Sequence, residues 1–491
     1  MRFSFKAIAA TFSLAAWALI ASAQHQDVAE KPTMWRGRFH FTSDTTSLLH
    51  ALKSGQMHGH FRYYFMSTDN KPGLSDYYAN AAGGGIRYES GKFHGFQVGI
   101  SGFFIFNVGS SDLAVEDSLT SAANRYETAL FDVEDPENKN DIDRLEEFQI
   151  SYSLRKSRIT FGKMLINTPL INLQDGRMRP TGVEGVWMEM KELKSVSVEG
   201  GYLYGFSPRG TTRWFREAES IGVFPTGLNP DGTRSGYRDN LKSKGVGVLG
   251  IKWQATPGIR VQAWNYYIDN IQNSALAQVD FQQGATTTLS ANGHGSGHAV
   301  DPGGFFGGVQ FVRQDAINHG GNEDQSKTYV LKGSKAMTYG ARAGWRNTTW
   351  ETSLSYNRIT DNGRYLFPRE WGRDPFYTFM PRERNDGYAD VHAAVARVQY
   401  SVPAKRFKIA LAGGYFDMPD VRDFARNKYG MPSYYQTNLD IRYEWKGILK
   451  GMETQILVVS KMRAGNVYDD MRYVINKVDM TLYHVVFNYH F

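Results

Sequence analysis

Apolar and polar residues alternate with a period of two along many short segments of the chain. In the last segment the odd-numbered positions are apolar or aromatic, namely Tyr483, Val485, Phe487, Tyr489 and Phe491. Polar residues stand at even-numbered positions between them, namely His484, Asn488 and His490. Similar alternation occurs in residues 148–155, 338–346, 407–415 and 437–445. Successive residues of a β-strand face opposite sides, so each of these segments predicts a strand with one apolar face.

This alternation fits either a soluble β-sandwich, whose inner face is apolar, or a transmembrane β-barrel, whose outer face is apolar. Two features favour the barrel. The chain has 28 Tyr, 30 Phe and 10 Trp, many of them near strand ends, where a barrel carries aromatic girdles. It also ends on Phe491 in an aromatic strand, which resembles the assembly signal of bacterial outer-membrane barrels.

Short and long connections largely take turns along the chain. Short polar links occur near residues 89–92, 155–157, 256–258, 346–348 and 402–404, and long ones near 109–146, 207–242, 314–334, 361–387 and 418–433. Short periplasmic turns and long outer loops produce this rhythm in a barrel. The segments predict an all-β fold, a transmembrane antiparallel β-barrel of about 18 strands. The count is weakest at residues 271–304, where a long link stands in place of a short turn.

The N-terminus has the pattern of a secretory signal peptide. Arg2 and Lys6 precede an apolar run over residues 7–20, and Ala21-Ser22-Ala23 follows as a small-residue cleavage site. The run is short for a spanning helix. We expect residues 1–23 to be removed and residues 24–491 to form one outer-membrane barrel domain. An N-terminal membrane anchor is the alternative.

Composition narrows the function further. The chain contains no Cys, so disulfides and thiol chemistry are excluded. The formal net charge is +7, and the charges are scattered, which does not favour a nucleic-acid partner. No cofactor motif stands out, and His294 and His298 lie in a glycine-rich loop rather than on a helix, so no metal site is predicted.

Three stretches of the sequence resemble the OprD-type porins, the substrate-specific outer-membrane porins of Gram-negative bacteria. The first is residues 59–65, Gly-His-Phe-Arg-Tyr-Tyr-Phe, and the second is residues 76–96, with its three consecutive glycines. The third is the most specific and contains Gly162-Lys163, Thr168-Pro169, Arg177-Met178-Arg179-Pro180-Thr181 and Glu184-Gly185. The likeness covers roughly the first 205 residues.

The resemblance implies an 18-stranded barrel, monomeric or trimeric, with the third stretch folded into the lumen as a constriction loop. Family members pass basic amino acids, carboxylates, small peptides or sugars, and a ladder of arginines lines their pores. We therefore expect outer-membrane lipid, lipopolysaccharide and small polar solutes as partners. The barrel assembly machinery would recognise the C-terminal Phe491.

Several basic residues fall on the polar parity of predicted strands. They are Arg62, Arg87, Arg342, Arg346, Lys408 and Arg442, with Arg397, Lys461 and Arg463 in strands that alternate less cleanly. A charge facing lipid at the midplane costs roughly 2–4 kcal/mol, so these side chains are expected to face a water-filled lumen. Cationic rings favour anions. Alternatively, these residues only balance acidic ones across the wall, namely Glu89, Glu189, Glu199, Glu351, Asp440 and Glu444.

Residues 167–184 read as a loop because they contain Pro169, Gly176, Pro180 and Gly182. The loop carries both signs of charge, at Asp175, Arg177, Arg179 and Glu184. If it enters the pore, as the family resemblance implies, these groups set a transverse field at the narrowest point. An ordinary surface loop is the alternative.

Two other functions remain in view. An outer-membrane lipase or protease needs a nucleophile with an oriented base, and no such set stands out in the sequence. A surface adhesin would use the long loops for binding. The acidic residues within 132–147 are expected to form a solvated outer loop, with a divalent cation as the alternative. The sequence therefore predicts a porin for small polar solutes such as amino acids, carboxylates, peptides or small sugars.

Overall fold

The fold is described from a computed structural model. The structure describes residues 44–140, 142–174, 176–283, 303–382 and 384–491. The expected signal peptide, Asp175 and the 284–302 segment lie outside the described residues.

Long β-strands make up most of the described chain. In the described residues there are eighteen of them: β1 (Gln56–Asp69), β2 (Tyr77–Glu89), β3 (Phe96–Asn107), β4 (Ile142–Leu154), β5 (Ser157–Met164), β6 (Gly182–Met190), β7 (Val196–Ser207), β9 (Val246–Thr256), β10 (Ile259–Ile268), β11 (Gln272–Gln282), β12 (Gly304–Ala316), β13 (Lys335–Arg346), β14 (Trp350–Ile359), β15 (Val391–Val402), β16 (Phe407–Asp417), β17 (Tyr434–Glu444), β18 (Met452–Arg463) and β19 (Met480–His490). The two-residue β8 (Phe215–Arg216) adds only a short pairing to β7.

Helices are few and short in the part of the chain that the structure describes. They are α2 (Leu48–Lys53), α3 (Glu217–Ser220) and the 3-10 turns η1 (Thr128–Leu130), η2 (Gln325–Lys327), η3 (Pro403–Lys405), η4 (Gly447–Leu449) and η5 (Met471–Tyr473). Among the described residues, no helix has the length and apolar character needed to cross a membrane.

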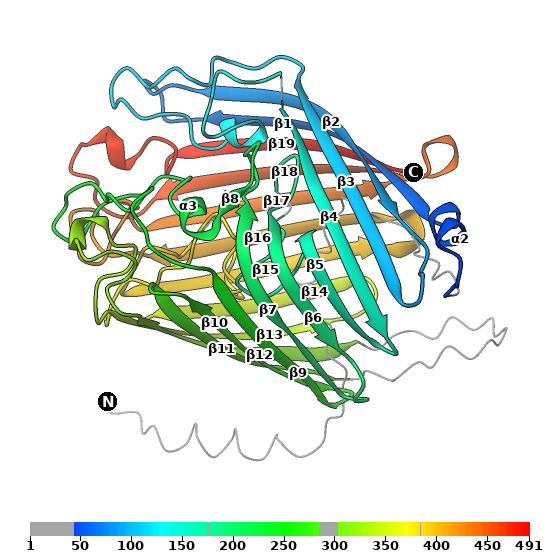
Figure 1. Cartoon of the computed structure of the whole chain (residues 1–491). Coiled ribbons are helices and arrows are strands. Elements are labelled where there is room, and N and C mark those ends of the chain that lie inside the picture. Colours follow the sequence, from blue (N-terminus) through cyan, green and yellow to red (C-terminus); the bar gives the residue numbers. More distant parts are fainter. Residues whose placement is uncertain (1–43, 141, 175, 284–302, 383) are drawn as a thin grey trace.

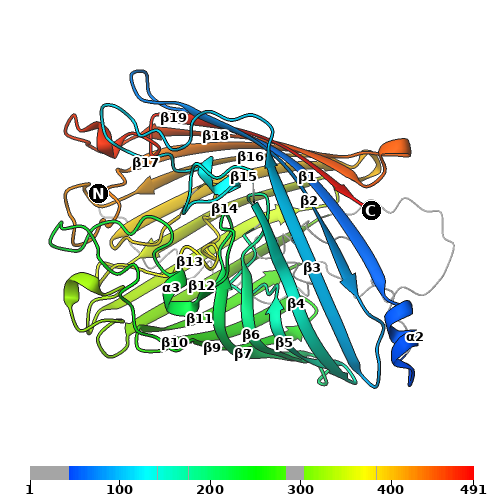
Figure 2. The same cartoon turned by 45° about the horizontal axis from the view of Figure 1, so that its top comes forward.

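The strands close into one antiparallel barrel (Figures 1 and 2). Each long strand pairs with its neighbour in sequence, and β7 pairs directly with β9 past the short β8. The last strand closes on the first in a ten-residue register from His60↔His490 to Asp69↔Thr481. The predicted eighteen-stranded transmembrane barrel is therefore confirmed. The doubtful count near residues 271–304 was right, since β11 and β12 pair regularly on either side of that link.

The connections sort by length between the two ends of the barrel. One end, here called the turn end, carries short links such as 155–156 and 257–258, together with α2 and the C-terminus (Figure 1). The opposite, loop end carries long connections, including 108–141, 208–245 and 360–390. The exception at the loop end is the link 269–271 between β10 and β11.

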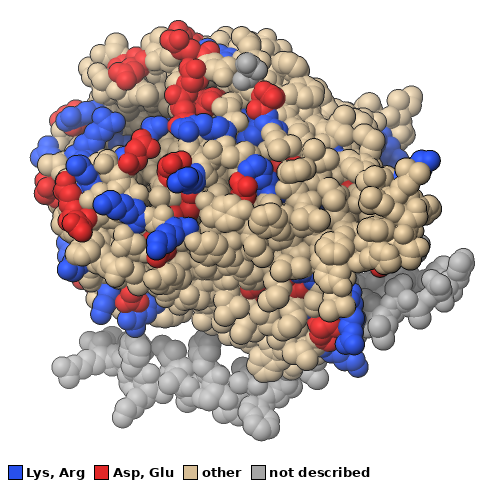
Figure 3. All heavy atoms as spheres, viewed as in Figure 1, with Lys and Arg blue, Asp and Glu red and all other residues tan. Residues whose placement is uncertain are grey.

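Strand parity separates the two faces of the wall as expected. On β1, Phe61 is 45% exposed on the outer face, whereas Arg62 and Tyr64 are buried on the inner face. On β19, Tyr483 and Tyr489 are exposed and His484 is buried. Figure 3 shows charged side chains gathered at the loop end of the visible face, beside a broad surface with few charges. That surface is the apolar band that a membrane covers.

The interior is not open throughout. Two connections fold inward from the loop end, at residues 165–181 and 360–390, and pack apolar side chains against a wall that runs from β6 to β17. Trp371 stacks on Phe206 of β7 at a ring separation of 4.3 Å, and Phe367 meets the ring of Tyr266 of β10 edge-on at 5.8 Å. An apolar core thus fills much of the interior and leaves free space along the remaining part of the wall.

Candidate functional site

A cavity of about 2020 Å³ occupies the unfilled side of the lumen. The wall around it comes from β1 and β15–β19, and the inward-folded connections bound it on the other side. At the loop end it reaches Arg472 and Lys477, and at the turn end it reaches Lys408 and Glu453, near the first residues of β16 and β18. The cavity therefore follows the barrel over most of its length.

The lining of this cavity is strongly cationic. Of the described residues that line it, sixteen are lysine or arginine and four are aspartate or glutamate. Fixed charges in a narrow space with low-dielectric walls focus the potential and concentrate ions of opposite sign. The cavity therefore attracts anions.

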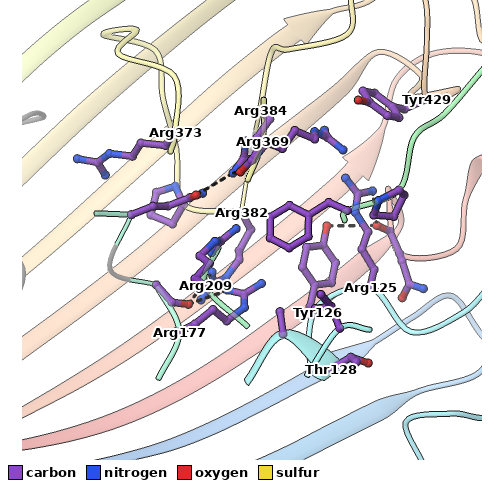
Figure 4. A pocket seen from close by; sticks show the side chains of 18 of the residues that line it. Arg125, Tyr126, Thr128, Arg177, Arg209, Arg369, Arg373, Arg382, Arg384 and Tyr429 are labelled. Carbon is purple, nitrogen blue, oxygen red and sulfur yellow. Dashed lines mark hydrogen bonds between the residues drawn. The ribbon is translucent and has the colours of Figure 1, made fainter. Parts of the chain in front are cut away.

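Three connections bring guanidinium groups together in the middle of the cavity. Arg177 comes from the 165–181 loop, Arg209 from the 208–245 connection and Arg382 from the 360–390 loop (Figure 4). They gather around Gly176, whose carbonyl accepts hydrogen bonds from Arg177 Nη1 at 2.7 Å and from Arg382 Nη1 at 3.2 Å. Arg382 Nη2 also donates to the hydroxyl of Tyr64 on β1 at 2.7 Å. We call these three arginines the constriction cluster.

The guanidinium groups of the constriction cluster repel one another. Burial, together with repulsion from Arg382, lowers the pKa of the Arg177 guanidinium to about 9. Burial and the neighbouring guanidiniums also lower the pKa of Arg209 well below its usual value. Among the described residues, no carboxylate forms an ion pair with any of the three. Because Arg177 keeps its proton at neutral pH and lies beside other guanidiniums, an anion that enters the cluster relieves their repulsion.

Other arginines of the 360–390 loop line the same cavity. Arg369 forms an ion pair with Asp386, Nε to Oδ2 at 2.8 Å. Arg384 Nη2 donates to the Arg369 carbonyl at 2.9 Å, and the Arg373 guanidinium lies 4.8 Å from the ring centre of Phe379. Figure 4 labels all three side chains among those that line the cavity.

Three of the predicted wall residues hold the inward-folded loops by their main-chain carbonyls. Arg62 Nη1 donates to the Arg177 carbonyl at 2.6 Å and Arg397 Nη2 donates to the Phe379 carbonyl at 2.8 Å. Lys461 Nζ donates to the Arg382 carbonyl at 2.9 Å. Arg62 and Arg397 also line the cavity, so they combine anchoring with charge.

Lys408 and Arg442, both on the polar parity of their strands, line the cavity at its turn end. Arg442 pairs with Asp440 two residues earlier on the same face of β17, at 2.9 Å. This pair matches the alternative interpretation, in which basic residues balance acidic ones across the wall. Arg442 therefore both lines the cavity and balances an acidic residue of the wall.

The remaining predicted wall residues lie elsewhere in the barrel. Arg87 pairs with Glu89 at 2.8 Å and Glu147 at 2.9 Å. Arg342 and Arg346 lie over the ring of Phe306 at 5.3 and 4.7 Å, on the wall that the apolar core covers. Arg463 ends β18 at the loop end and lies 3.6 Å from Asp479. Among the described cavity-lining residues none of these four is present, because packing or a carboxylate partner holds each of them outside the open space.

The predicted constriction loop does fold into the lumen, but its charged residues occupy different environments. Arg177 lines the cavity, whereas Arg179 is fully buried and donates to the Thr211 carbonyl at 2.6 Å, beside Glu146. Glu184 lies on the outward parity of β6, the parity of exposed Met188, and pairs with Lys163. Arg179 and Glu184 are therefore not part of the cavity lining, since one fixes neighbouring loops and the other faces outward.

Several acidic residues of the 132–147 stretch contact arginines or a hydroxyl, and Thr212 Oγ1 donates to Asp132 Oδ2 at 2.8 Å. Glu134 pairs with Arg213 at 2.8 Å, and Glu146 pairs with Arg144 at 2.6 Å. Within the part of the chain that the structure describes, no group of three or more histidine, aspartate or glutamate residues is placed to hold a metal ion.

Sequence reasoning missed the cationic residues that the 208–245 and 360–390 connections place in the cavity lining. They are Arg209, Arg234, Arg238, Arg369, Arg373, Arg382 and Arg384. A usable signal was present, because the 361–387 link is rich in arginine and proline, which is unusual for a loop that is only solvated. Nothing in the sequence places Arg209 beside them, since that contact joins distant connections.

Comparisons with known proteins agree with this arrangement. The family model described as "outer membrane porin, OprD family" matches residues 52–303, about half of the chain. No curated protein sequence matches significantly.

Solved structures share the fold at low sequence identity. OccAB1 of Acinetobacter baumannii has a TM-score of 0.67 at 13% identity, with 92% of this chain and 99% of that chain covered. OccK9 (OpdG) of Pseudomonas aeruginosa has a TM-score of 0.66 at 15% identity, covering 90% and 99%. OpdK of the same organism, solved with vanillate, has a TM-score of 0.65 at 14% identity, also covering 90% and 99%. The chain therefore belongs to the OprD family and is an outer-membrane porin, of the Gram-negative type, through which small polar solutes pass.

Proposed function

We propose that this porin is anion-selective and passes small solutes that carry a carboxylate group. The constriction cluster is the observation that carries the proposal. A guanidinium presents parallel N–H donors that match the two oxygens of a carboxylate. Three such groups converge from separate connections, and among the described residues no carboxylate pairs with them.

The wall residues support the same direction of selectivity along the cavity. A solute that leaves the constriction cluster toward the turn end meets Arg397, Lys408 and Arg442. A series of moderately attractive positions lets an anion bind and then move on, which conduction requires. We therefore assign Arg62, Arg397, Lys408 and Arg442 to the permeation path.

Reversal potentials in a planar bilayer under a salt gradient test the proposal. The expected result is anion selectivity that falls in Arg177→Gln and is nearly unchanged in Arg472→Gln. Arg472 is a suitable control because it lines the same cavity but is exposed and paired with Asp470 at 2.6 Å. A cation-selective or silent channel would overturn the proposal.

Processing and assembly follow from the two ends of the chain. We propose that the signal peptide is cleaved after Ala23 and that the assembly machinery binds Phe491. The Phe491 main chain pairs with Gly59 on β1 and its side chain is 68% exposed, which supports recognition from outside the barrel. N-terminal sequencing of the purified protein tests the first point, and the yield of folded barrel from a Phe491 deletion tests the second.

Oligomeric state and chemistry complete the proposal. Both a monomer and a homotrimer are compatible with the sequence, and native mass spectrometry in detergent distinguishes them.

We infer transport without catalysis, as expected for a porin. Hydrolysis of ester and peptide substrates by the purified protein would contradict this.

A further inference from the structure

Arg209 is the member of the constriction cluster whose side chain makes no hydrogen bond to a described residue. Arg177 Nη1 donates to the Gly176 carbonyl, and Arg382 joins Gly176, Tyr64 and His484. The Arg209 side chain has neither a hydrogen bond nor an ion pair with any described residue. Its one aromatic contact is the ring of Phe224, 5.9 Å from the guanidinium carbon.

This arginine is nevertheless buried, with 9% of its surface exposed, and it lines the cavity. A buried charge without a partner is costly and normally signals a missing interaction. Its Nε is fully enclosed and has no acceptor among the described residues. The Arg209 side chain is therefore placed to receive an anionic group that arrives through the cavity.

Gly176 brings the Arg209 guanidinium close to the rest of the cluster. A Cβ atom built on Gly176 would lie 3.2 Å from Arg382 Nη1 and 3.7 Å from Arg209 Nη1. The two guanidiniums thus share one small space above the loop main chain, close enough for one small dicarboxylate to reach both. Figure 4 shows the side chains of Arg177, Arg209 and Arg382 together at this point.

The number of positive charges bears on the type of solute. One carboxylate occupies one guanidinium in a bidentate manner. A monocarboxylate occupies only one of the three guanidiniums, whereas a second carboxylate on the same molecule pairs with another, and Arg209 supplies that additional position. We propose that Arg209 tunes the constriction for solutes with two or more carboxylates, an inference that rests on the proposed function above.

The test compares propionate, succinate and tricarballylate, which carry one, two and three carboxylates on short aliphatic skeletons. At about pH 7.5 these groups are largely ionised. Each solute is titrated against the chloride current of the full-length porin in a planar bilayer, and its half-blocking concentration is measured. Four proteins are compared: wild type, Arg209→Gln, Arg209→Lys and the control Arg234→Gln. Arg234 lies on the same connection and lines the same cavity, but it is exposed.

In the wild type we expect succinate to bind at least about tenfold more tightly than propionate, and tricarballylate to bind at least as tightly as succinate, since a factor of ten corresponds to one modest added interaction. Arg209→Gln should reduce the succinate-to-propionate ratio to about threefold or less while propionate binding stays nearly constant. Arg209→Lys should keep much of the ratio, and Arg234→Gln all of it. Retained propionate binding shows that Arg209→Gln is folded.

Three outcomes would overturn the inference. In the first, the wild type does not distinguish succinate from propionate. In the second, Arg209→Gln keeps the wild-type ratio. In these first two outcomes, the proposed carboxylate function is retained as long as propionate still binds. In the third, no carboxylate blocks the wild-type current and the channel is not anion-selective, and then the proposed function falls together with this inference.

Discussion

The side chain of Arg62 on the barrel wall donates a hydrogen bond of 2.6 Å to the main-chain carbonyl of Arg177 in the inward-folded loop. One arginine thus fixes the position of another by binding its backbone, while both side chains line the cavity. The neighbouring bond from Arg62 Nε to Asn488 Oδ1, at 2.7 Å, holds the anchoring group against the closing strand β19. The width of the pore at this point therefore depends on a contact between wall and loop.

Replacing Arg62 should loosen the loop. A hydrogen bond with a charged donor contributes about 1.5–3 kcal/mol, so Arg62→Ala should raise the frequency of gating events and the current noise in single-channel recordings. Arg442→Ala is the matched control, because Arg442 lines the cavity but pairs with Asp440 on its own strand. Equal noise in the two variants would show that the loop is held without Arg62.

Arg177 and Arg179 should behave differently although they are two residues apart. Arg177→Ala removes a charge from the permeation path, worth about 1 kcal/mol to an anion at close range in water, and should lower the anion-to-cation permeability ratio about fivefold. Reversal potentials measure this ratio. The heat stability of the folded barrel in detergent should change little.

Arg179→Ala should instead destabilise the loops. Arg179 is 1% exposed and lies beside the buried Arg144–Glu146 pair, and breaking such a buried network costs about 3–5 kcal/mol. The expected results are faster proteolysis of the 108–141 and 208–245 connections and a lower unfolding temperature. Normal stability combined with altered selectivity would mean that Arg179 faces the pore.

Anion selectivity should depend on pH through Lys428. This lysine lines the cavity with its Nζ 4.6 Å from the ring centre of Tyr237, and burial, with repulsion from Arg364, lowers its pKa to about 7. Asp374, another lining residue, has a pKa raised to about 6 by burial and by Asp386. As the pH rises through this range the lysine loses its positive charge and the aspartate becomes negative.

The chloride-to-potassium permeability ratio should therefore fall between about pH 5.5 and pH 8. Lys428→Met should show a flatter dependence and lower selectivity at the acidic end. Selectivity that increases with pH would contradict the assignment of both groups.

The buried carboxyl group of Glu217 should make the loop end less stable at higher pH. Glu217 is 2% exposed in α3, and burial raises its pKa to about 7. Because the folded state holds the proton more tightly than the unfolded chain, the neutral group stabilises the fold below the usual pKa of glutamate. That contribution is lost as the pH rises toward 7.

Glu217→Gln keeps the neutral form at every pH. At about pH 8 the variant should gain about 1–3 kcal/mol of stability over wild type, seen as slower proteolysis of the 208–245 connection. At about pH 4 the two proteins should be indistinguishable. A destabilised variant at the higher pH would indicate that the charged carboxylate has a stabilising partner.

The strands could be predicted because their pattern is local. Each residue of β19 shows by parity whether it faces membrane or lumen, so Tyr483 and His484 were assigned to the correct faces from their order alone. The lengths of the links then gave the two ends of the barrel. Both signals repeat along the chain, and a repeated signal tolerates local exceptions such as the short 269–271 link.

The site could be predicted only in part, because it depends on where non-repeating connections fold. Parity placed Arg62 and Lys408 on the inner face, and the family resemblance placed the loop of Arg177 in the lumen. Parity also placed Arg342 on the inner face, but it cannot show that Tyr377, from a distant connection, covers it at 4.5 Å. Arg209 was missed for the same reason, since its neighbours come from other connections.

The apolar packing of Trp371 and Phe367 against the barrel wall has a consequence for how such a channel can diversify. Apolar side chains fasten the inner loops to one half of the cylinder, whereas on the opposite half polar anchors, among them Arg62, Arg397 and Lys461, hold the same loops. Mutations on that opposite half that spare these anchors can change which solutes the channel admits without loosening the scaffold.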